Sequence, residues 1–84
     1  MSEPLLTILY FAALRDLAGI SEERVACPAA RNVEGLLRAL EERHGALNGR
    51  LGSVRVAVNE EFVELSTALR GGEVVALIPP VSGG

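Results

Sequence analysis

The chain has 84 residues, of which 49% are hydrophobic, and this length suffices for one compact domain rather than two. Eight arginines and no lysine oppose eleven acidic residues, giving a net charge of −3, so the basic surface that binds nucleic-acid phosphates is not expected. The longest apolar run, residues 8–14, is far shorter than the roughly 20 residues that span a bilayer. We therefore expect a single domain over residues 1–84 that binds neither nucleic acid nor membrane.

The cysteine and histidine content argues against metal chemistry. Cys27 is the only thiol and His44 the only imidazole, so the chain alone forms neither a disulfide nor a metal site of ordinary stoichiometry. Cys27 is predicted to be a small, half-buried apolar residue, and His44 to lie in the last turn of a helix, where it suits the helix dipole. The first four residues carry an acid and no base, unlike a secretory signal. These features predict a cytoplasmic protein that binds no metal and no cofactor itself.

The first half of the chain is predicted to contain two strands separated by a short helix. Residues 5–11 are rich in β-branched and aromatic side chains and form the first strand. Its two faces are both apolar, with Leu6, Ile8 and Tyr10 on one and Leu5, Leu9 and Phe11 on the other. A short helical turn over residues 12–18 is ended by Gly19, and residues 23–27 then alternate as a more exposed strand.

One substantial helix is predicted over residues 33–44. Asn32 is a suitable N-cap, and Gly45 closes the helix. Its apolar residues recur at helical spacing: Val33, Leu36, Leu37 and Leu40. This helix therefore has one apolar stripe with which to cover a sheet.

Three further strands are predicted after the helix. Residues 54–58 alternate as a strand, residues 59–61 turn the chain, and residues 62–64 return as a short antiparallel partner. Residues 69–72 form another turn, and residues 73–78 are a last, strongly apolar strand. The resulting order predicts an α+β fold with one main helix packed across a mixed sheet, which is the order of the β-grasp, or ubiquitin-like, fold.

The first and last strands are apolar on both faces, although one helix covers only one face of a sheet. In the β-grasp fold these strands are neighbours, so we expect Phe11 and Ile78 to meet on the uncovered face and Phe62 to extend the patch. A partner protein is the natural cover for such a patch. Shielding by loops of the same chain is the alternative.

The last six residues differ from the rest of the chain: Pro79, Pro80, Val81, Ser82, Gly83 and Gly84. The prolines supply no backbone donor, so the strand must stop and the chain is expected to leave the body as a stiff stem. Glycines lack a side chain and can pass through a narrow channel. The terminal α-carboxylate becomes an acyl donor once a partner enzyme transfers AMP to it from ATP. A frayed end without function is the alternative interpretation.

Several segments together resemble the small subunits of molybdopterin synthase, a family of ubiquitin-like sulfur carriers. They are Phe11-Ala12-Ala13-Leu14-Arg15-Asp16-Leu17-Ala18-Gly19, Val58-Asn59, Leu69 before Gly72, and the end Pro79-Pro80-Val81-Ser82-Gly83-Gly84. The resemblance implies that an ATP-dependent, E1-like enzyme adenylates Gly84 and converts it to a thiocarboxylate. It also implies that the tail enters the active site of the large subunit, which builds the dithiolene of molybdopterin from cyclic pyranopterin monophosphate.

The resemblance also assigns partner contacts. Phe11, Phe62 and Ile78 fall at positions that contact the large subunit, and Arg15 falls at a position that contacts the activating enzyme. The family assembles as a heterotetramer around a dimer of large subunits. Its turn often reads Asp-Gly-Asp-Glu where this chain has Gly71-Gly72-Glu73-Val74, so a role for acids in that turn stays unassigned.

Other functions of the same fold remain open at this point. A thiamine-pathway sulfur carrier also ends in Gly-Gly but is usually shorter and lacks the proline stem. A ubiquitin-like protein modifier would join the activated tail to a lysine of another protein. An enzyme acting alone is disfavoured, because the chain offers no combination of nucleophile, base and cleft. The ultimate sulfur donor does not follow from the sequence.

Overall fold

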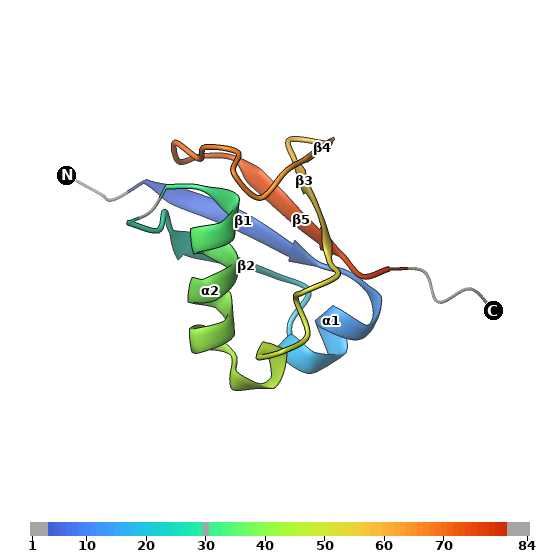
Figure 1. The fold of residues 1–84 in the computed structure, drawn as a ribbon. Helices are drawn as coiled ribbons and strands as arrows, with labels where there is room; N and C mark the ends of the chain where they lie inside the picture. The colour runs from blue at the N-terminus through green and yellow to red at the C-terminus, as the bar shows by residue number, and fades with distance from the viewer. Residues whose placement is uncertain (1–3, 30, 81–84) are drawn as a thin grey trace.

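The structure, a computed structural model, describes residues 4–29 and 31–80. Figure 1 shows a twisted sheet with the longer helix on one side of it and the shorter helix near one end. The elements, in chain order, are β1 (Leu5–Tyr10), α1 (Ala12–Ala18), β2 (Glu22–Ala26), α2 (Val33–Arg43), the 3₁₀ turn η1 (Gly45–Leu47), β3 (Arg55–Val58), β4 (Glu61–Val63) and β5 (Val74–Ile78). Within the described part of the chain, no helix is long and apolar enough to cross a membrane.

The five strands lie in the order β2-β1-β5-β3-β4. β1 and β5 are parallel neighbours at the centre, and the other three pairs are antiparallel. A parallel pair needs a long crossover, and the segment between β1 and β5 contains the helices, β2 and the β3–β4 hairpin. The predicted α+β fold, with β-grasp order and one main helix, is confirmed.

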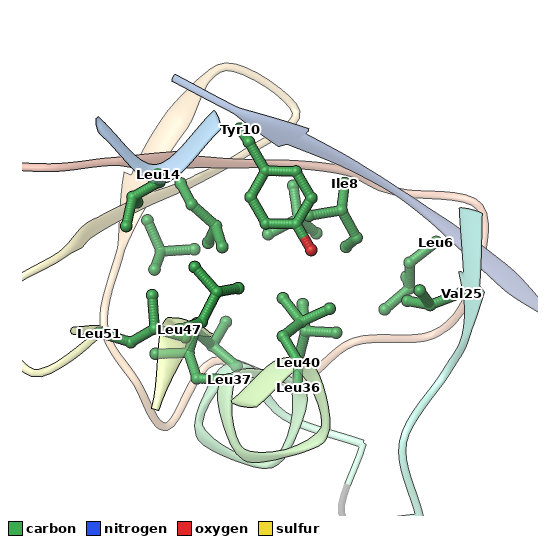
Figure 2. Packing of buried hydrophobic residues seen from close by; sticks show 14 of the residues in the cluster. Leu6, Ile8, Tyr10, Leu14, Val25, Leu36, Leu37, Leu40, Leu47 and Leu51 are labelled. Carbon is green, nitrogen blue, oxygen red and sulfur yellow. The ribbon is translucent and has the colours of Figure 1, made fainter. Parts of the chain in front are cut away.

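The core lies between α2 and one face of the sheet, which we call the inner face. Figure 2 shows Leu6, Ile8 and Tyr10 of β1 pointing toward Leu36 and Leu40 of α2. The alternation predicted for this strand is confirmed, because these three residues are buried while Leu5 on the opposite face is exposed. The remaining core residues come from every layer: Leu14, Val25, Val33, Leu37, Leu47, Leu51, Val56, Leu69, Val75 and Leu77.

The predicted N-terminus of α2 is confirmed, but its C-terminus differs from the prediction. The side chain of Asn32 accepts a hydrogen bond of 2.8 Å from the amide of Gly35. The helix ends at Arg43 with His44 as its C-cap, whereas Gly45 begins η1. The reason is tertiary: η1 turns the chain back so that Leu47 enters the core, a contact that helical periodicity does not reveal.

The turn between β3 and β4 is also tighter than predicted. It contains two residues, Asn59 and Glu60, both with positive φ, as in the hairpin turns that match strand twist. Ala57 consequently pairs with Phe62. The predicted three-residue turn would have placed Phe62 opposite Val58, which lies on the inner face. The tighter turn thus sets Phe62 on the outer face, away from α2.

Candidate partner-binding site

The outer face of the sheet carries a row of apolar side chains across four strands. Strand register aligns Leu9 of β1 with Ala76 of β5, Ala76 with Ala57 of β3, and Ala57 with Phe62 of β4. Phe62 is 56% exposed, a large fraction for a phenylalanine in a sheet. The main helix of the described chain lies on the other face and does not cover this row, in which Phe62 is exposed, Leu9 and Ala76 are half-buried and Ala57 is buried.

Two more of the predicted partner-binding residues lie at one end of this face. Phe11 follows β1 in extended conformation and is 45% exposed. Because Tyr10 pairs with Leu77, the next residues in register are Phe11 and Ile78, and Ile78 is partly exposed. Loop shielding, the alternative considered above, does not occur among the described residues, since Phe11 and Phe62 both remain accessible. We call Phe11, Phe62 and Ile78 the apolar patch.

Arg15 lies apart from the apolar patch. It is an exposed residue of α1, the short helix that follows Phe11 directly. The helix ends at Gly19, which has φ of +80° and donates a hydrogen bond to the carbonyl of Arg15. The segment from Phe11 to Gly19 therefore exposes the ring of Phe11, directly after β1, and the guanidinium of Arg15, on α1. The contact of Arg15 with an activating enzyme stays a prediction.

Arg55, which no sequence pattern singled out, lies among the residues of the apolar patch. Arg55 pairs with Ile78 across the strands, and its Cζ lies 4.2 Å from the centroid of the Phe62 ring. An open groove of about 540 Å³ adjoins this pair, lined by residues 54–56 and 62–65. Strand alternation predicts that Arg55 is exposed, but its stacking on Phe62 depends on the two-residue turn that the sequence analysis misjudged.

The predicted tail begins where β5 ends. Pro79 is half-buried and Pro80 is exposed, directly after Ile78 at the edge of the apolar patch. The ladder of β5 stops at Ile78, as expected from two residues without a backbone donor. The remaining tail residues, Val81, Ser82, Gly83 and Gly84, lie outside the described residues, so their predicted roles stay predictions.

A second feature missed from the sequence is a polar cluster at the inner edge of the sheet. Glu23 of β2 accepts hydrogen bonds from the Tyr10 hydroxyl at 2.5 Å and from Arg43 Nε at 2.8 Å, and its Oε2 lies 2.6 Å from His44 Nε2. Burial acts to raise the pKa of Glu23, but these hydrogen bonds outweigh it and hold that pKa below its usual range. The ionised carboxylate places a proton on Nε2 of His44.

The same cluster acts on Tyr10. Burial, followed by the hydrogen bond to Glu23, raises the pKa of the Tyr10 hydroxyl, so it remains a donor at every physiological pH. The ring of Tyr10 also meets that of His44 edge to face, with centroids 5.9 Å apart. The cluster joins β1, β2 and the end of α2, so His44 is a structural residue that contacts a carboxylate besides suiting the helix dipole.

In the turn before β5, side-chain oxygens accept hydrogen bonds from backbone amides. Glu73 accepts from the amides of Arg70 at 2.8 Å and Gly71 at 2.7 Å. Burial acts to raise the pKa of Glu73, and these backbone donors lower it more, so the net shift is downward. Asn59 and Val74 share two hydrogen bonds. The side-chain Oδ1 of Asn59 accepts from the backbone amide of Val74, and the backbone amide of Asn59 donates to the carbonyl of Val74. An acid therefore has a structural role in this turn.

Cys27 and the acidic residues do not form a metal site among residues 4–29 and 31–80, where no group of three possible ligands is found. Cys27 is half-buried against the core, with its Sγ 3.8 Å from the carbonyl oxygen of Leu69. The prediction of a small, half-buried residue is confirmed.

Comparison with solved structures agrees with this geometry. The crystal structure of small archaeal modifier protein 1 from Haloferax volcanii is 33% identical, with a TM-score of 0.84, and the match covers 95% of this chain and 99% of that one. A complex of subunits 1 and 2 of molybdopterin-converting factor from Helicobacter pylori contains a chain that is 26% identical, with a TM-score of 0.66 and coverage of 95% and 99%.

Sequence comparison confirms the resemblance read from the motifs. A molybdopterin synthase sulfur carrier subunit from Chlamydomonas reinhardtii is 37% identical over 79 residues, which cover 92% of this chain and 95% of the relative. The model of the ThiS family matches residues 8–84, which include the second half of β1, all of β5 and the whole tail. The chain belongs to the ThiS family.

Proposed function

We propose that this chain is the sulfur carrier subunit of a molybdopterin synthase. The observation that carries the proposal is the junction at Ile78, where the open apolar patch and the Pro79-Pro80 stem meet at one end of the sheet. A partner that covers the patch is thereby positioned to receive the residues that follow. The similarity to synthase subunits along nearly the whole chain supports the same conclusion.

The reacting group in this proposal is the α-carboxylate of Gly84. One of its oxygens attacks the α-phosphorus of ATP on an E1-like enzyme, and pyrophosphate leaves. A sulfide-level nucleophile, hydrosulfide, then displaces AMP from the acyl-adenylate and loses its proton to solvent, leaving a thiocarboxylate. Two such sulfurs convert cyclic pyranopterin monophosphate to the dithiolene of molybdopterin on the large subunit. ATP is a substrate of the activating enzyme, and this chain binds no cofactor.

In this proposal the chain donates sulfur without being a catalyst by itself. The apolar patch seats the large subunit, Arg15 contacts the activating enzyme, and two carriers flank a dimer of large subunits in a heterotetramer. The complex of subunits 1 and 2 from Helicobacter pylori supports pairing with a second subunit, because its small chain shares this fold. The segment that enters the active site of the large subunit ahead of Gly84 consists of Pro79, Pro80, Val81, Ser82 and Gly83.

The experiment that tests the proposal is the intact mass of the chain purified from cells that make it. A species heavier by one oxygen-to-sulfur exchange, located at Gly84 by fragmentation, is expected. Deletion of Gly84 should abolish both this species and synthase activity while leaving the melting temperature unchanged. Gly83→Val should fold normally and lose sulfur transfer. Full synthase activity of the Gly84 deletion would contradict the proposal.

A second function is favoured by the similarity to small archaeal modifier protein 1: attachment of the tail to another protein. The same activated carboxyl would then acylate a lysine amine with loss of AMP. The chain has no lysine of its own, so lysine-linked chains of itself do not form. Covalent adducts that disappear in the Gly84 deletion would support a modifier. Co-purification with a thiazole synthase would support the thiamine pathway instead.

A further inference from the structure

We infer that Arg55 is a specificity-determining residue of the apolar patch, and that the partner presents a carboxylate to it. The inference rests on the proposed function, because it takes the large synthase subunit as the partner. It adds to that proposal a charge requirement that apolar contacts alone do not impose.

Arg55 lies on the strand between two residues of the apolar patch. Arg55 pairs with Ile78 of β5 on one side, and its guanidinium lies over the ring of Phe62 of β4 on the other. Neighbouring strands are about 4.8 Å apart and successive residues about 3.4 Å, and Phe62 pairs with Ala57, two residues from Arg55. Ile78 and Phe62 are therefore roughly 12 Å apart, with Arg55 on the strand between them. A protein surface that covers both Ile78 and Phe62 must also cover Arg55.

Arg55 forms no ion pair among the described residues. No carboxylate lies within 4.0 Å of its guanidinium, and Glu64, which lines the same groove, is not paired with it. Stacking on a ring occupies the face of the guanidinium and leaves its N–H donors, which lie in its plane, directed outward. Water satisfies these donors in the free chain, and an acceptor must replace that water when the patch is covered.

A carboxylate is the acceptor that best suits the Arg55 guanidinium. A cation removed from water without a counter-charge strongly opposes binding, while a carboxylate matches the planar fork with two parallel hydrogen bonds. The open groove beside Arg55 and Phe62 offers room for an acidic side chain of the partner, although Glu64 of this chain also lines it. Stacking on Phe62 also restricts the rotamers of Arg55 before binding, which lowers the entropy lost on pairing.

The test is titration of the large subunit with variants of the full chain. Arg55→Met keeps an apolar side chain over Phe62 and removes the charge, and it should weaken binding by about 10- to 100-fold. Arg55→Glu should weaken it further, and one acidic residue of the large subunit changed to arginine should restore much of the loss. Arg24→Met is the matched control, because Arg24 is an exposed arginine at the opposite edge of the outer face. It should change binding less than about threefold.

Two further measurements keep the inference separate from the proposed function. Melting temperatures of the Arg55 variants should match that of the wild type, so that lost binding is not lost folding. Unchanged binding of Arg55→Met, together with weakened binding of Phe62→Asp, would overturn the role of Arg55 and leave the patch and the sulfur-carrier proposal intact. Self-association of the chain that Arg55→Glu abolishes would also overturn it, because the occupant would then be a second copy. Failure of the sulfur-carrier proposal itself would be read from the mass of the Gly84 terminus.

Discussion

The two faces of the sheet are built from similar residues and have opposite surroundings. On β5, Val75 and Leu77 are completely buried beneath the helical side, while their neighbours Val74 and Ile78 face outward and remain accessible. Burial of apolar area stabilises whichever association removes it from water. Burial of the inner face therefore stabilises the fold. The apolar area of the outer face is still exposed, and its burial would stabilise association with a partner.

The largest expected effect comes from breaking the inner face. Leu77→Ala should lower the free energy of unfolding by about 2–5 kcal/mol, because it leaves a cavity in the core between the sheet and the helices. Ile78→Ala, one residue along the same strand, should lower it by about 1 kcal/mol or less, since that side chain already contacts solvent. Urea unfolding of both variants checks this difference. Equal losses at the two positions would show that the faces are energetically alike.

The converse experiment targets the outer face. Phe62→Asp should cost several kcal/mol in binding to the large subunit, because it puts a charge where association excludes water. The melting temperature of the chain alone should change little, since Phe62 is mostly exposed. Calorimetric titration and thermal melting measure the two effects. A large fall in melting temperature with unaltered binding would make Phe62 a core residue.

Acid sensitivity is expected from the polar cluster at the rim of the inner face. The pKa of Glu23 is lowered in the folded state from its usual value of 4.5, so its ionised form stabilises the fold above that pH. This stabilisation is lost as the pH falls through the lower folded-state value. Glu23→Gln should cost about 1–3 kcal/mol at pH 7 and show a smaller loss on acidification than the wild type.

Denaturant unfolding of both proteins at pH 7 and at several values below 4.5 measures this linkage. Glu73 also has a lowered pKa, so it adds its own loss of stability in acid. Because Glu73 is present in both proteins, this loss is common to the two profiles and serves as an internal reference. Parallel pH profiles for wild type and Glu23→Gln would contradict the role assigned to the cluster.

The smallest effect is expected at the turn that sets the register of β5. Gly71 has φ of +114°, and a Cβ there would overlap the Cβ of Pro4. Gly71→Ala should therefore cost about 1–2 kcal/mol, more than Gly72→Ala, where φ is +89° and the space is open. Thermal melting compares the two. If the turn loses its register, side chains of β5 exchange faces, and binding through Ile78 should fall as well.

Much of the fold followed from local patterns. Alternation along residues 5–11 predicted which side chains of β1 are buried, and helical spacing together with Asn32 predicted the start of α2. The errors occurred at turns, where a difference of one residue changes the pairing of the strands or the end of a helix. The hairpin turn was predicted one residue too long, and η1 with the buried Leu47 was absent from the prediction, because neither carries a periodic signal.

The sequence by itself determined the order of strands and helices and the end of β5 at two prolines. It also determined that the strands have more apolar faces than one helix can cover. Each of these features depends on residues close together in the chain. Only the tertiary structure decided the stacking of Arg55 on Phe62 and the joining of Tyr10, Glu23 and His44. Glu23 is 13 residues from Tyr10 and 21 from His44. Contacts over such separations depend on how the sheet is ordered and which turn sets its register, and no local pattern encodes either.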